Sequence, residues 1–104
     1  QNIQNAYRKA TITPQLVCQE SVELLGYSKT LILKGNPNAI SDAGAAAFLA
    51  DAALAGGFLN ICINLVSVTE KIYLRKMNSL MKQWVRKRNH LMGRILKALK
   101  TETV

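Results

Sequence analysis

The segment of residues 43–65 constrains the fold most strongly, because it carries only one charged side chain, that of Asp51. A helix that is apolar around its whole circumference lies either in the middle of a bundle or across a membrane. The segment is long enough for either place. Its Ala and Gly residues supply little transfer free energy, and Asp51, Asn60 and Asn64 would be costly in lipid. The sequence therefore favours a central bundle helix over a membrane span.

A second helix is predicted before this segment, over residues 14–34, where apolar residues recur at helical spacing. Thr13 is a candidate N-cap, and Pro14 suits the first helical position because it lacks an N–H group. Gly35 suits the position just after the helix, where a left-handed backbone is common. Residues 1–12 are interpreted as the tail of a helix or a loop.

Pro37 prevents the helix from continuing, and Ser41 or Asp42 can cap the central helix that follows. Thr69 is the candidate cap of a last helix over residues 70–100. That helix carries one apolar stripe, made of Tyr73, Met77, Leu80, Met81, Trp84, Leu91, Ile95 and Leu99. No strand alternation or internal repeat is visible. The prediction is one all-α domain, residues 1–104, built as a helical bundle around an Ala/Gly-rich helix.

The charge balance favours acidic partners, because 14 Lys and Arg residues oppose 6 acidic residues and give a net charge of +8. Most of these cations fall in the last predicted helix. Nucleic acid, anionic lipid or a polyanionic small molecule would each be attracted, and a solvated bundle face is the simpler alternative. Tyr73 and Trp84 lie on the apolar stripe, away from the cations, so stacking on nucleic-acid bases is poorly supported. Nucleic acid and membrane are therefore not favoured.

Metal and nucleophile chemistry find little support in the sequence. His90 is the single histidine and has no Cys, His or carboxylate at ligand spacing, so no metal site is predicted. Cys18 and Cys62 match no redox or metal spacing and are interpreted as two buried free thiols, which suits a reducing cytoplasm. Asp51 and Asn64 interrupt an apolar helix. Either they bind a neighbouring helix, or they face a ligand or a subunit seam.

The run from Lys34 to Val68, KGNPNAISDAGAAAFLADAALAGGFLNICINLVSV, resembles the cyclodeaminase/cyclohydrolase family of folate enzymes. This family includes the C-terminal domain of formiminotransferase-cyclodeaminase and the bacterial methenyltetrahydrofolate cyclohydrolases. The resemblance rests on a Gly-Asn-Pro-Asn turn, a Ser-Asp pair, a helix of small residues and an Asn-x-x-x-Asn-Leu ending. It extends over about residues 6–75 and fades in the basic tail.

The resemblance implies a self-associating all-α protein with a folate site at or near the subunit seam. A cyclohydrolase opens the methenyl ring of its folate with water, and a cyclodeaminase closes a formimino folate and expels ammonia. Both reactions need a group that transfers protons. The substrate would be a tetrahydrofolate derivative, with no metal and no other cofactor, in the cytoplasm.

The resemblance also assigns roles to residues of the turn and the helix. Asn36, Asn38, Ser41 and Asn64 are predicted to bind the folate. Asp42 is predicted to be the catalytic carboxylate, which steers a proton or pairs with the pterin, and helix capping is its competing role.

Members of this family are longer and begin with further helices, including a Gly- and Ser-rich segment. We therefore expect this chain to be the C-terminal part of such a domain, with its core completed by self-association or by an N-terminal half. Its activity as a separate chain is left open. The alternative hypothesis is a non-catalytic basic helical module that binds a protein partner, nucleic acid or an anionic membrane.

Overall fold

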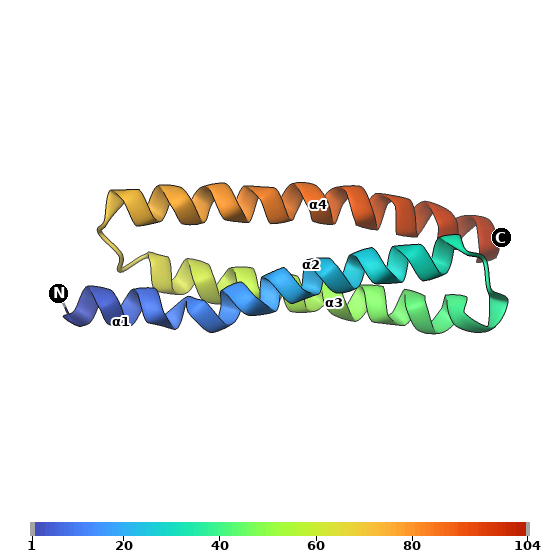
Figure 1. Ribbon diagram of the computed structural model, residues 1–104, viewed down its shortest axis with the longest axis horizontal. Coiled ribbons are helices and arrows are strands. Elements are labelled where there is room, and N and C mark those ends of the chain that lie inside the picture. Colours follow the sequence, from blue (N-terminus) through green and yellow to red (C-terminus); the bar gives the residue numbers. More distant parts are fainter. Residues whose placement is uncertain (1, 104) are drawn as a thin grey trace.

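The computed structural model describes residues 2–103, with the side chains of residues 3–100, and every regular element in that range is an α-helix. Helix α2 continues the direction of α1, α3 returns along it, and α4 runs in the direction of α2, which gives an elongated antiparallel bundle (Figure 1). Its dimensions are 55 × 18 × 17 Å. The all-α prediction is confirmed. The helices are α1 (Asn2–Ala10), α2 (Ile12–Leu33), α3 (Pro37–Leu65) and α4 (Lys71–Thr103).

The break between α1 and α2 falls at Thr11, so the prediction that Thr13 is the N-cap is wrong. The buried Thr11 hydroxyl donates to the carbonyl of Arg8 at 2.7 Å and is also hydrogen-bonded to the Tyr73 hydroxyl of α4. These two hydrogen bonds fix the position of Thr11 between the two helices, and α2 begins at the next residue, Ile12. Pro14 still lies within the first turn, where its missing N–H leaves no hydrogen bond unmade.

The connection between α2 and α3 is a short turn around Gly35. Gly35 has φ +72°, the left-handed conformation that was predicted for it. Asn36 is extended, at φ −72° and ψ 109°, and its side chain accepts a hydrogen bond from the amide of Asn38 at 3.0 Å. Because Asn36 caps the helix and Pro37 takes its first position, α3 begins before Ser41 and Asp42. The prediction that one of those two residues caps the helix is therefore wrong.

The connection between α3 and α4 is held by the side chain of Gln4 from α1. Gln4 Nε2 donates to the carbonyl of Ser67, and the amide of Thr69 donates to Gln4 Oε1, both at 3.0 Å. The amide of Leu74 donates to the carbonyl of Glu70, which places Glu70 at the N-cap of α4. The expected cap at Thr69 is therefore one residue too early.

The core forms where the small residues of α3 meet α2 and the apolar stripe of α4. Of the glycines, Gly57 makes the closest approach to a neighbouring helix. A Cβ atom added there would lie 2.7 Å from Cys18 Sγ and 3.1 Å from the Pro14 carbonyl oxygen. Every member of the predicted α4 stripe is buried or half-buried. One cluster contains Cys18, Leu54, Ile61, Met77 and Trp84, and a second contains Leu25, Ile32, Ala47, Met92 and Ile95.

The opposite face of α3 is exposed, although it is also apolar. The side chains of Leu49, Leu59 and Ile63 are 72%, 65% and 68% exposed. By length and composition alone α3 could cross a membrane, as the core helices of many soluble proteins could. A large apolar helix face is normally covered by another surface. Completion of the core by self-association or by an N-terminal half remains the prediction for this face.

Gly57→Ala is expected to lower the free energy of unfolding by about 1–3 kcal/mol, because the new methyl group overlaps Cys18 and the backbone at Pro14. Gly56→Ala is the matched control, since nothing lies within 4 Å of its added Cβ. It is expected to raise stability by up to about 1 kcal/mol through helix propensity. Urea unfolding followed by circular dichroism measures both variants. Equal effects at the two positions would contradict the close packing at Gly57.

Candidate functional site

A cleft lies between α2 and α3 beside the Gly35 turn. It has a volume of about 350 Å³. Asp42 contributes a carboxylate group and Asn38 an amide group, and these two residues lie one turn apart on α3. Tyr27 and Ser28 contribute hydroxyl groups from α2. The remaining wall is apolar and consists of Leu24, Leu31, Ala39, Ala43 and Ala46. The cleft therefore combines an apolar wall with a small set of polar groups, as is usual for ligand sites.

Two of the predicted site residues, Asn38 and Asp42, line this cleft together. Asp42 is exposed, and within residues 3–100 no hydrogen bond or ion pair holds its carboxylate. Asn36 lies outside the cleft lining, and its side chain is used in capping α3. Ser41 is exposed and does not line the cleft.

Asn64 lies at the other end of α3. Its side chain donates to the Asn60 carbonyl at 2.9 Å, which is a bond within the helix. About six helical turns separate Asn64 from Asp42, or roughly 33 Å at 1.5 Å per residue. A single chain therefore does not bring Asn64 and Asp42 to one small ligand. The assignment of Asn64 to the folate site stays a prediction that requires another chain.

The structure decides between the two alternatives for Asp51, whose carboxylate binds a neighbouring helix. The Arg88 guanidinium of α4 donates from Nε to Asp51 Oδ1 at 2.7 Å and from Nη2 to Oδ2 at 2.8 Å. These hydrogen bonds hold the pKa of Asp51 below its ordinary value of 3.8, although partial burial acts in the opposite direction. The same hydrogen bonds raise the pKa of Arg88. Neither this partner nor its register follows from the sequence.

A second concave surface follows α3 and α4 beyond the Asp51–Arg88 pair. Two adjoining hollows, of about 490 and 610 Å³, share Phe58, Cys62 and Val85. Cys62 is exposed there, so its predicted burial is wrong, because α3 buries the face that carries Gly57 and Ile61 instead. Cys18 is buried as predicted, and desolvation raises its pKa to about 11. Within the described residues, no group of three or more His, Cys, Asp or Glu side chains could hold a metal ion.

The sequence profile of the formiminotransferase-cyclodeaminase family matches residues 1–83 of this chain. The chain therefore belongs to that family, as its resemblance predicted. A methenyltetrahydrofolate cyclohydrolase from Methylorubrum extorquens is 34% identical over 71 residues, which are 68% of this chain and 34% of that protein. The matched region thus spans about a third of the length of this curated relative. No solved structure matches.

Removing the Asp51–Arg88 pair is expected to lower stability by about 1 kcal/mol at neutral pH, since solvent reaches both groups and weakens the interaction. Because the folded-state pKa of Asp51 is lowered, this contribution is complete above pH 3.8 and is lost as the pH falls through the lowered value. Urea unfolding of Asp51→Asn, Arg88→Gln and the double variant, at pH 7 and at pH 2.5, measures the coupling. A coupling free energy that stays unchanged at the lower pH would contradict this account.

Proposed function

We propose that this chain takes part in the hydrolysis of methenyltetrahydrofolate, with the α2–α3 cleft forming one wall of the folate site. Family membership and the cyclohydrolase relative support a folate one-carbon reaction. The observation that carries the proposal is the position of Asp42, an exposed carboxylate at the edge of a partly apolar cleft. A carboxylate in such a place is available to accept a proton from a bound water molecule.

In the proposed reaction, water adds to the methenyl carbon and gives up a proton to the Asp42 carboxylate. The carbon–nitrogen bond of the ring then breaks, and the proton passes from Asp42 to the departing ring nitrogen. The hydroxyl group of the adduct loses its own proton to solvent as the formyl C=O bond forms. The net change is the addition of one water molecule to the methenyl cation and the release of one proton, which yields a formyl folate. Asn38 stands one turn from Asp42 and provides a donor and an acceptor for the polar edge of the pterin. Tyr27, Leu24 and Leu31 provide apolar surface for its flat face.

A formiminotetrahydrofolate cyclodeaminase activity is the second candidate, because the family profile carries that name. The same carboxylate would then assist ring closure, and ammonia would be the leaving group. The proton-transfer role of Asp42 is common to both reactions. Product analysis for ammonia distinguishes them.

The proposed site requires more than this single chain. Asn64 and Asp42 lie at opposite ends of α3, and the outer face of α3 is exposed and apolar. A second copy, or further chain that covers this face, would complete the core and bring additional polar groups to the cleft. We propose that folate is the substrate in this assembly, that no metal or other cofactor is used and that the assembly works in the cytoplasm. A non-catalytic basic module is the outcome if folate is not bound.

Asp42→Asn is expected to lower the rate of methenyltetrahydrofolate ring opening by about 100-fold or more, since the proton acceptor is lost. The measurement is the loss of methenyl absorbance above the spontaneous rate, beside a folate titration of the same preparation. Glu23→Gln is the matched control, because Glu23 is an exposed carboxylate on α2 that does not line the cleft.

Three outcomes would contradict the proposal. Equal rates for Asp42→Asn and the unaltered chain would remove the catalytic role of Asp42. Equal losses in both variants would indicate a general charge effect. An assembly in which the outer face of α3 is covered, and which still neither binds nor converts the folate, would contradict the folate function.

A further inference from the structure

The groove between α3 and α4, which we call the α3–α4 groove, is lined by residues of α3 from Asp51 to Leu65, by Val66 just after that helix, and by residues of α4 from Leu74 to Arg88. Its two hollows share lining residues and are therefore continuous. At 1.5 Å per residue the groove extends over roughly 20 Å, which is the length of about four helical turns. Its floor is apolar and includes Leu54, Phe58 and Val85.

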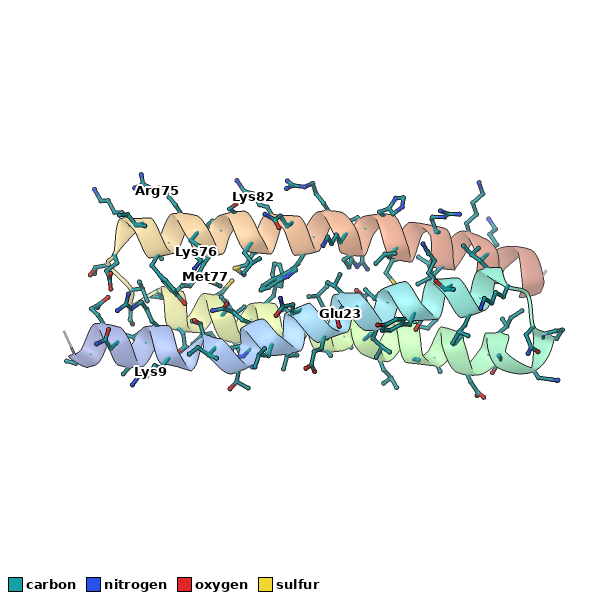
Figure 2. The ribbon with its side chains drawn as sticks, in the orientation of Figure 1. Lys9, Glu23, Arg75, Lys76, Met77 and Lys82 are labelled. Atoms are coloured by element: carbon teal, nitrogen blue, oxygen red, sulfur yellow. The ribbon has the colours of Figure 1, made fainter. Side chains whose placement is uncertain are left out.

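The two rims of this groove differ in charge. The rim on α4 carries Lys82 and Arg86, and these two residues also belong to a polar surface with Arg75, Asn78 and Ser79. Arg75 and Lys82 project from the same side of α4, away from the other helices (Figure 2). Within residues 3–100, no carboxylate forms an ion pair with either rim cation. The rim on α3 includes Ala55 and Leu59, and its one charged lining residue, Asp51, is already paired with Arg88.

We propose that the α3–α4 groove binds an amphipathic helix that has an apolar stripe and acidic residues along one flank. The apolar stripe would cover Phe58 and Val85, and the acidic flank would face Lys82 and Arg86. A helix that lays its apolar face in a groove between two others is a common mode of recognition. It would also make a fourth member of the bundle beside α3 and α4. This inference does not depend on the folate activity.

The charges of the chain argue against a second copy as the occupant. The chain carries a net charge of +8 and only 6 acidic residues, of which Asp51 and Glu70 are already paired with arginines. Among the described residues, the exposed carboxylates outside these pairs are Glu20, Glu23 and Asp42, so most faces of a docked copy would bring cations toward Lys82 and Arg86, and like charges oppose such contact. A partner rich in Glu or Asp along one flank has the complementary charge.

The test uses two synthetic 18-residue helical peptides with the same Leu stripe, one with Glu and the other with Lys along one flank. Fluorescence anisotropy of labelled peptide measures binding to the intact chain. The acidic peptide is expected to bind at least about ten-fold more tightly than the basic peptide. The reason is that its Glu side chains attract Lys82 and Arg86, whereas the Lys side chains of the basic peptide repel them. This preference is expected to weaken as salt is added.

Cys62 reports where the peptide binds, because it lines both hollows and is exposed. The bound acidic peptide is expected to slow alkylation of Cys62 by iodoacetamide. Cys18 is the internal control, since it is buried and should remain unreactive in the folded chain. Full reactivity of Cys62 in the peptide complex would show that the peptide binds elsewhere and would overturn the proposal.

The double variant Lys82→Glu/Arg86→Glu is expected to reverse the preference, so that the basic peptide binds more tightly. Lys76→Glu/Lys87→Glu carries the same charge change at exposed positions of α4 that do not line the groove, and it should keep the original preference. Circular dichroism confirms that both variants fold. An unreversed preference, or the same change in the control, would overturn the proposal. A second copy would be the occupant if, without peptide, the chain doubled its mass in solution and the alkylation of Cys62 slowed as the chain concentration rose. That result would overturn the proposal.

Discussion

The close approach of α2 and α3 at Gly57 is the contact on which the rest of this structure depends. There is room for Cys18 beside Gly57 only because α3 has no side chain at that point. The buried thiol also donates weakly to the carbonyl of Leu54, at 3.7 Å between Sγ and O. Ala43, Ala47 and Ala50 keep the same face of α3 narrow and are buried. The long Ala- and Gly-rich sequence of α3 is thus explained by the distance between two helix backbones.

This close contact also determines where the concave surfaces form. The α2–α3 cleft lies beside the turn, where larger residues such as Tyr27 and Leu31 stand along its edge. The α3–α4 groove forms because α4 meets α3 through larger side chains, among them the edge-to-face pair of Phe58 and Trp84. One helix therefore contributes to two different surfaces. One carries an exposed carboxylate, and the other has a basic rim.

The sequence predicts the elements of this fold well, because their determinants are local. The stripe of α4 and the left-handed Gly35 need only helical periodicity and backbone preference. The caps are predicted less well, since Asn36, Ser41 and Asp42 all suit an N-cap. Only the geometry of Asn36 before Pro37 decides among them.

The candidate site is predicted only in part. The resemblance selects Asn38 and Asp42, but their common helix face depends on the start of α3 at Pro37, since a cap at Ser41 or Asp42 would leave Asn38 in the turn. The partner of Asp51 does not follow from the sequence, because α4 presents several cations and only the register between helices selects Arg88. The exposure of Cys62 could not be predicted either. A helix that is apolar on every side does not reveal which face it buries.

The hydrogen bonds of Gln4 to Ser67 and Thr69 have a consequence for the order in which the chain can fold. They join α1 to a connection more than sixty residues later in the sequence. As the chain is synthesised, α1 has no such partner until that connection has emerged. We therefore expect local helices to form first and these two hydrogen bonds of α1 to form later, because they require closure of a long loop.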